Sequence, residues 1–142
     1  MSNIVLSLQR VTKTFGGKGD VPLVEIFKGM DFNVKRNEVV GLFSPSGSGK
    51  TTLLQIAGLL DSQFSGDIYI NGSKVDTKND FQTSIIRRKN IGFVFQFHHL
   101  IQEFSALENI IFPLLFEGIS KGIAVRKGQH LSLIHISEPT RP

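Results

Sequence analysis

The segment SPSGSGKT, Ser44 to Thr51, constrains this chain more than any other part of it. Small residues at Gly47 and Gly49 let backbone N–H groups converge on an anion, and a helix that starts at the end of the loop adds the positive end of its dipole. The apolar run 39–43 predicts a buried strand before the loop, and residues 52–57 predict a helix after it. In this context a glycine-rich loop holds the phosphates of a nucleoside triphosphate.

The loop side chains have separate expected tasks. Lys50 is expected to reach the β- and γ-phosphates, and the Thr51 hydroxyl suits Mg²⁺, which prefers oxygen ligands. The predicted phosphate-binding set is Ser44, Pro45, Ser46, Gly47, Ser48, Gly49, Lys50, Thr51 and Thr52.

One loop position departs from the motif G-x-x-x-x-G-K-[ST], because the chain has Ser44 where the motif has glycine. Serine is small, so the loop closes without strain if the backbone there has negative φ. If the position needs positive φ, the substitution strains the turn.

Composition agrees with one globular domain or part of one, since 40% of the 142 residues are hydrophobic and 20% are charged. The N-terminal segment lacks the basic start and apolar centre of a secretory signal, so the chain is expected in the cytoplasm. The net charge of +4 is scattered except at Arg87, Arg88 and Lys89. We expect this triplet to form a solvated face, and we predict no nucleic-acid partner.

Alternating and turn patterns predict an antiparallel sheet at the front of the chain. Residues 4–11 and 30–34 alternate as half-buried strands do, and Asn71-Gly72 predicts a tight hairpin turn. The apolar run 91–95 predicts another buried strand, which ends just before Gln96.

A helix is predicted further along the chain. Ser105 and Glu108 have the spacing of a capping box, and apolar residues follow at helical spacing. Pro113 is expected to bend this helix or to end it early.

The segments SGSGKTTLL, SGDIYING and GFVFQ occur here in the order found in ATP-binding-cassette (ABC) ATPases, and the chain resembles the N-terminal part of their nucleotide-binding domain. The resemblance implies an α/β P-loop NTPase fold with an N-terminal antiparallel β-subdomain, and it implies ATP and Mg²⁺ as cofactors. It gives catalytic roles to Lys50 and to Gln96, which would reach toward Mg²⁺ and the attacking water. Phe15 matches the aromatic residue that stacks on adenine, although the family usually has tyrosine there.

A narrower resemblance lies in residues 96–110, QFHHLIQEFSALENI, which are similar to a segment of the ATPase subunits of lipoprotein-releasing transporters of Gram-negative bacteria. It implies coupling of ATP binding and hydrolysis to release of lipoproteins from the inner membrane. The ATPase would lie on the cytoplasmic face and bind transmembrane permease subunits. The alternatives are the ATPase of a macrolide-efflux or cell-division type exporter, a P-loop kinase, and an inert nucleotide-binding fragment.

ABC ATPases hydrolyse ATP between two copies arranged head to tail, and the resemblance covers only part of what they need. The sequence contains no LSGGQ-type signature and no apolar strand ending in Asp-Glu, the Walker B strand. We therefore expect residues 1–130 to be a partial nucleotide-binding domain that is inactive alone and exposes apolar edges. Residues 131–142, LSLIHISEPTRP, resemble a translated sequencing adapter and are expected to be an artefact.

Overall fold

The computed structural model of the protein describes residues 3–17, 19, 22–97 and 99–136. The chain is divided into two compact units, Met1–Phe93 and Val94–Pro142.

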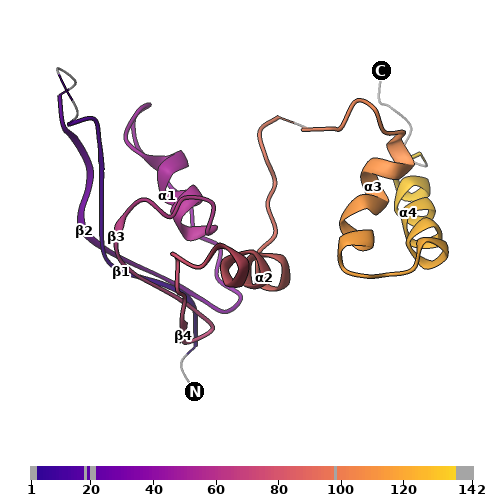
Figure 1. The fold of residues 1–142 in the computed structure, drawn as a ribbon, viewed down its shortest axis with the longest axis horizontal. Helices are drawn as coiled ribbons and strands as arrows, with labels where there is room; N and C mark the ends of the chain where they lie inside the picture. The colour runs from indigo at the N-terminus through magenta and orange to yellow at the C-terminus, as the bar shows by residue number, and fades with distance from the viewer. Residues whose placement is uncertain (1–2, 18, 20–21, 98, 137–142) are drawn as a thin grey trace. The chain divides into compact units, whose positions relative to one another are not determined.

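The first unit is built on a four-stranded antiparallel sheet, as the sequence predicts (Figure 1). The strand order is β2-β1-β3-β4. The two long strands extend beyond the predicted ranges. Phe15, at the end of β1, pairs with Val24, at the start of β2. The strands are β1 (Ile4–Phe15), β2 (Val24–Lys35), β3 (Ser65–Ile70) and β4 (Ser73–Lys74).

The hairpin between β3 and β4 has the predicted turn. Asn71 and Gly72 both have positive φ, 50° and 80°, and Ile70 pairs with Ser73 across the turn. Two consecutive positive φ values are typical of the tight turns that match the twist of the flanking strands, which is why Asn-Gly predicted it.

Helix α1 (Lys50–Ala57) covers one face of the sheet and follows the glycine-rich loop directly. Its buried residues Leu53 and Ile56 pack in one core with residues of β1 and β3. Removing this apolar surface from water favours the contact between helix and sheet, and it places the start of α1 at a fixed position. The buried core residues are Leu8, Val11, Leu53, Ile56, Leu59, Ile68, Ile70 and Val75.

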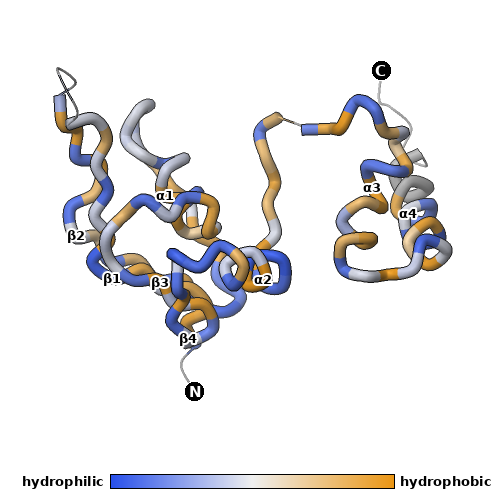
Figure 2. The backbone as a smooth tube through the Cα atoms, in the orientation of Figure 1, coloured by the Kyte–Doolittle hydropathy of each residue, from blue (hydrophilic) through white to orange (hydrophobic). Residues whose placement is uncertain are grey.

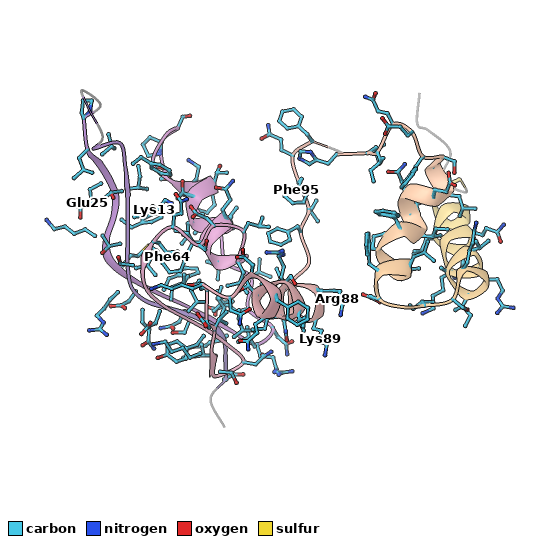
Figure 3. The ribbon with its side chains drawn as sticks, viewed as in Figure 1. Lys13, Glu25, Phe64, Arg88, Lys89 and Phe95 are labelled. Carbon is cyan, nitrogen blue, oxygen red and sulfur yellow. The ribbon has the colours of Figure 1, made fainter. Side chains whose placement is uncertain are left out.

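Helix α2 (Asp80–Asn90) begins at Asn79, whose side chain accepts a hydrogen bond from the Gln82 N–H. Its last turn carries the basic triplet. Arg88 and Lys89 are exposed, as a solvated face requires (Figure 3), but Arg87 is half-buried and donates to the Leu59 carbonyl at 2.6 Å. The prediction was therefore wrong for Arg87, because the guanidinium satisfies a carbonyl just after α1.

The two predicted buried strands, 39–43 and 91–95, are not formed. Val39 is 98% exposed and Val94 is 102% exposed, so these predictions of buried strands were wrong. A strand is stabilised by hydrogen bonds to neighbouring strands, and among the described residues neither segment has such a neighbour. Figure 2 shows that the segment of the chain that follows α2 is mainly hydrophobic.

The described residues of the second unit form two helices, α3 (Ala106–Phe116) and α4 (Lys121–Ile136). The capping box at Ser105 and Glu108 is confirmed, and Pro113 lies inside α3, which continues to Phe116 rather than ending early. The helices meet closely at Gly128, where an added Cβ would overlap Ile111.

Helix α4 passes from His130 to Leu131 without a break, across the point where the adapter-like segment begins. Residues 137–142 of that segment lie outside the described residues. No helix in the described part of the chain has both the length and the apolar character needed to span a bilayer.

Candidate nucleotide-binding site

The backbone of the glycine-rich loop has the conformation that its glycines predict. Gly47 has φ 80° and Gly49 has φ 93°, both in the region that other residues rarely adopt. Gly49 is also tightly placed, because a Cβ there would overlap the Ile26 side chain, whereas a Cβ at Gly47 would have nothing within 4 Å. Glycine is therefore required at position 47 for its backbone conformation, and at position 49 for both conformation and space.

Ser44 does not strain the loop. It is not among the described non-glycine residues with positive φ. Its hydroxyl contacts the Ser48 hydroxyl, and the Ser48 hydroxyl also donates to the Pro45 carbonyl at 2.8 Å. A serine at the first position is thus compatible with a closed loop, and it adds a polar contact across it.

Lys50 is held against the loop that precedes it. Its ammonium donates to the carbonyls of Ser44 and Pro45 at 2.7 and 2.8 Å, and it lies 3.4 Å from the Ser44 hydroxyl. These contacts place a positive charge beside the loop backbone, where a phosphate would need it.

The N-terminus of α1 fits an anion. Gly49 is the N-cap, no side chain caps the helix, and the first turn carries no acidic residue. The N–H groups of a first helical turn have no partner within the helix, and the helix dipole adds positive potential at that end. Neither a cap nor a carboxylate competes there with a phosphate.

One pocket of about 330 Å³ is lined by both Phe15 and the loop, although Phe15 lies 29 positions before the start of the loop at Ser44. This volume is at the lower end of the range for small-molecule sites. Thr51 and Thr52 are part of its wall, and their side chains carry hydroxyl oxygens of the kind that Mg²⁺ prefers. The pocket is lined by Phe15, Ile26, Ser46, Gly47, Gly49, Lys50, Thr51 and Thr52.

Ser44 and Ser48 line a neighbouring hollow of about 300 Å³, which shares Gly49 and Lys50 with the pocket. Pro45 contributes its carbonyl to the Lys50 ammonium and to the Ser48 hydroxyl. Every residue of the predicted phosphate-binding set except Pro45 therefore lines the pocket or the neighbouring hollow.

Gln96 is the one predicted site residue outside this group. It belongs to the second unit and is exposed. Its neighbour Phe95 makes an edge contact with His99, with ring centroids 5.1 Å apart. The role predicted for Gln96 stays a prediction.

Sequence reasoning missed two residues that belong to the site or support it. Ile26 on β2 forms part of the pocket wall and packs where Gly49 has no side chain. Lys13 on β1 lies with its ammonium 4.8 Å from the centre of the Phe15 ring. The one signal for Lys13 was its spacing of two from Phe15, which places both side chains on the same face of a strand.

A glycine-rich loop that leads into a helix beside a sheet is the arrangement of a P-loop nucleotide-binding protein. The chain belongs to the ABC transporter family, whose sequence model matches residues 27–139.

Curated relatives make the similarity more specific. The lipoprotein-releasing system ATP-binding protein LolD of Roseobacter denitrificans is 43% identical over 131 residues, which is 92% of this chain and 57% of the relative. LolD of Bacteroides thetaiotaomicron is 43% identical over 116 residues, 82% of this chain and 50% of the relative. The chain thus spans about half the length of the curated relatives it matches.

Solved structures agree with the fold. The ATP-binding cassette MJ0796, in a dimeric post-hydrolysis state bound to ADP and Pi, has a TM-score of 0.78 and 37% identity to this chain. The match covers 88% of this chain and 54% of that one. The fold is therefore that of an ABC nucleotide-binding domain, α/β with an N-terminal antiparallel sheet.

Proposed function

We propose that this chain is part of the ATP-binding subunit of an ABC transporter that releases lipoproteins from the inner membrane, and that it binds ATP with Mg²⁺ at residues 44–52. The observation that carries the proposal is the pocket in which Phe15 faces the same space as Lys50 and Thr51. An aromatic ring suits a purine base, and a cationic loop at a helix N-terminus suits phosphates.

The residues divide the work by chemistry. Backbone N–H groups at the start of α1 would hold the β-phosphate, and the Lys50 ammonium would turn from the loop carbonyls to neutralise the β- and γ-phosphates. The Thr51 hydroxyl would ligate Mg²⁺, and Gln96 would reach toward the metal and the attacking water. Bound Mg²⁺ supplies charge neutralisation for phosphoryl transfer. Phe15 would stack on adenine.

The full protein would complete this site with a second copy. In the proposed assembly two ATPase subunits face each other head to tail and bind transmembrane permease subunits on the cytoplasmic face of the inner membrane. The LolD name of the relatives supports the cargo, and the dimeric MJ0796 cassette supports the pairing. The chain alone is proposed to have negligible ATPase activity.

A chimaera tests the transporter assignment. Residues 1–130 of this chain would replace the matching part of LolD of Roseobacter denitrificans, in cells depleted of their own LolD. We expect the chimaera to restore lipoprotein release and growth, and the same chimaera with Lys50→Ala to fail. Accumulation of the chimaera at normal levels without any restored release would argue against this transporter class.

A further inference from the structure

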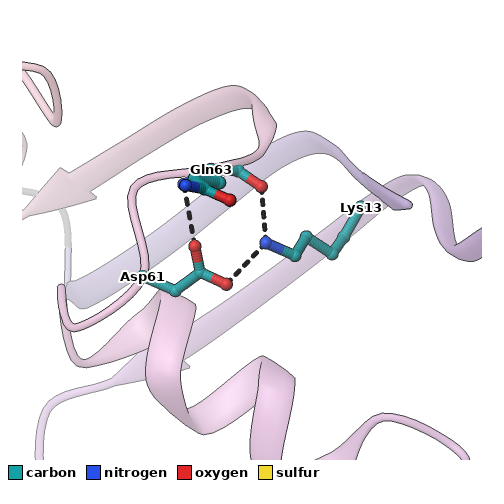
Figure 4. A network of polar contacts seen from close by, with 3 residues as sticks. All are labelled: Lys13, Asp61 and Gln63. Carbon is teal, nitrogen blue, oxygen red and sulfur yellow. Dashed lines mark hydrogen bonds and ion pairs between the residues drawn. The ribbon is translucent and has the colours of Figure 1, made fainter. Parts of the chain in front are cut away.

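A buried cation lies beside the pocket but outside the phosphate loop. Lys13 is 3% exposed, and its ammonium is 2.7 Å from a carboxylate oxygen of Asp61. The same ammonium donates to the Gln63 carbonyl at 2.6 Å, and the other Asp61 oxygen accepts from the Gln63 N–H at 2.7 Å (Figure 4). The ammonium is therefore fixed from two sides by the segment that follows α1.

This fixed ammonium also lies against Phe15. It is 4.8 Å from the centre of the ring, within the range of a cation–π contact. Phe15 is 48% exposed and contributes to the wall of the pocket. Lys13 thus lies over the ring of Phe15, and Phe15 also lines the pocket.

The contact matters because phenylalanine has no hydroxyl with which to anchor its ring. Phe15 is the last residue of β1, and the positive-φ residue Gly16 follows it. The Lys13 ammonium, held by Asp61 and Gln63, gives the ring a fixed contact at the end of the strand.

We propose that Lys13 is a positioning residue, which Asp61 and Gln63 hold so that its ammonium fixes the Phe15 ring for stacking on a purine base. The inference deepens the proposed function and depends on it. Lys13 acts on the base alone, because its ammonium is engaged by Asp61, Gln63 and the ring, and it is not among the pocket-lining residues. Affinity for the base should therefore depend on Lys13, and affinity for the phosphates should not.

The test compares two ligands on the 142-residue chain. Equilibrium dialysis would give the dissociation constants of the non-hydrolysable analogue AMP-PNP and of inorganic tripolyphosphate, both with Mg²⁺. For Lys13→Met we expect AMP-PNP to bind about fivefold to tenfold more weakly, with tripolyphosphate changed less than about twofold. Lys13→Arg should restore most of the loss, since it keeps a cation for both contacts.

Matched variants separate positioning from a general structural effect. Lys74→Met removes the cation of another ion pair of the same sheet, Lys74 with Asp67 at 2.8 Å, and should leave both affinities unchanged. Phe15→Ala should show the AMP-PNP loss by itself, and adding Lys13→Met to it should weaken AMP-PNP no further. Lys13→Met/Asp61→Asn removes both charges, so it avoids a buried unpaired carboxylate, and it should behave like Lys13→Met.

The outcomes that overturn the proposal are distinct. Equal weakening of both ligands in Lys13→Met and in the double variant would show that Lys13 supports the fold and not the ring. Unchanged AMP-PNP affinity would show that the ring needs no such restraint. If the unsubstituted chain bound neither ligand, the proposed function itself would fail, and this inference with it.

Discussion

Gly49 is the residue at which backbone conformation and packing meet. Its φ of 93° is unfavourable for a residue with a Cβ, and the space that a Cβ needs is taken by Ile26. Gly47 has only the first constraint, with φ 80° and open space around it. The two positions therefore form an internal comparison between strain and crowding.

Gly49→Ala should lower the free energy of unfolding by about 2–4 kcal/mol, because conformational strain and overpacking add, and Gly47→Ala by about 1–2 kcal/mol. Denaturant unfolding followed by circular dichroism checks both values. Gly49→Ala should also displace the start of α1 and weaken AMP-PNP binding more than Gly47→Ala does. Equal effects of the two substitutions would contradict the packing argument.

At this scale, the sequence predicted what a local motif specifies. Gly47 and Gly49 were expected to supply conformational freedom, and their positive φ values confirm it. The ion pair of Lys13 with Asp61 was not predicted, because 48 positions separate its partners and only folding brings them together. The contact of Ile26 with Gly49 was missed for the same reason.

At the scale of elements, the antiparallel sheet and the local signals are confirmed, but the two buried strands predicted from apolar runs are not formed. The Asn71-Gly72 hairpin and the capping box of α3 depend on neighbours within a few residues, and both are confirmed. The strands expected at 39–43 and 91–95 depend on pairing with other strands, and neither is formed. An apolar run indicates that a segment favours burial, but it does not identify the neighbouring strand with which the segment would pair.

The capping box gives a prediction for α3. Ser105 accepts from the Glu108 N–H at 3.3 Å and donates its hydroxyl to the Glu108 carboxylate at 2.7 Å. Ser105→Ala should destabilise α3 by about 1 kcal/mol, and this loss corresponds to about fivefold faster hydrogen exchange of the α3 amides. Exchange of the α1 amides provides the control and should not change. An unaltered α3 rate would contradict the assigned cap.

The same box predicts a pH dependence. The pKa of Glu108 is lowered, first by the hydrogen bond from the Ser105 hydroxyl and then by that from its backbone N–H. A lowered pKa in the folded state means that the ionised carboxylate stabilises α3 above the unfolded-state pKa of about 4.3, and that this stabilisation is lost as the pH falls through the folded-state value. Glu108→Gln should remove this dependence. Hydrogen exchange of the α3 amides between pH 6 and pH 3, corrected for intrinsic rates, measures this dependence. Identical pH profiles for the unsubstituted chain and Glu108→Gln would count against the prediction.

At the scale of the whole molecule, large apolar side chains remain exposed in both units. Val39 and Phe43 are 98% and 96% exposed in the first unit, and Val94 and Phe97 are 102% and 69% exposed in the second. Exposed apolar surface of this kind favours association with a partner or with further copies of the chain.

We therefore predict that the 142-residue chain self-associates at micromolar concentrations. Sedimentation velocity should show species larger than 15.7 kDa, and the combined substitutions Val39→Lys and Val94→Lys should shift them toward the monomer. The combined substitutions Gln82→Lys and Gln129→Lys, at exposed polar residues of α2 and α4, add the same two charges without removing apolar surface and serve as the control. A monodisperse monomer with a cooperative thermal transition would contradict the prediction.

Binding of the ATP phosphates by residues 44–52 is tested by equilibrium dialysis of AMP-PNP with Mg²⁺ against the chain and its Lys50→Ala variant. This method tolerates self-association. Lys28→Ala, at a lysine 87% exposed on β2, is the control for loss of one positive charge. We expect saturable binding by the chain and by Lys28→Ala, and at least about a hundredfold weaker binding by Lys50→Ala. Equal affinity of Lys50→Ala and the unsubstituted chain would contradict it.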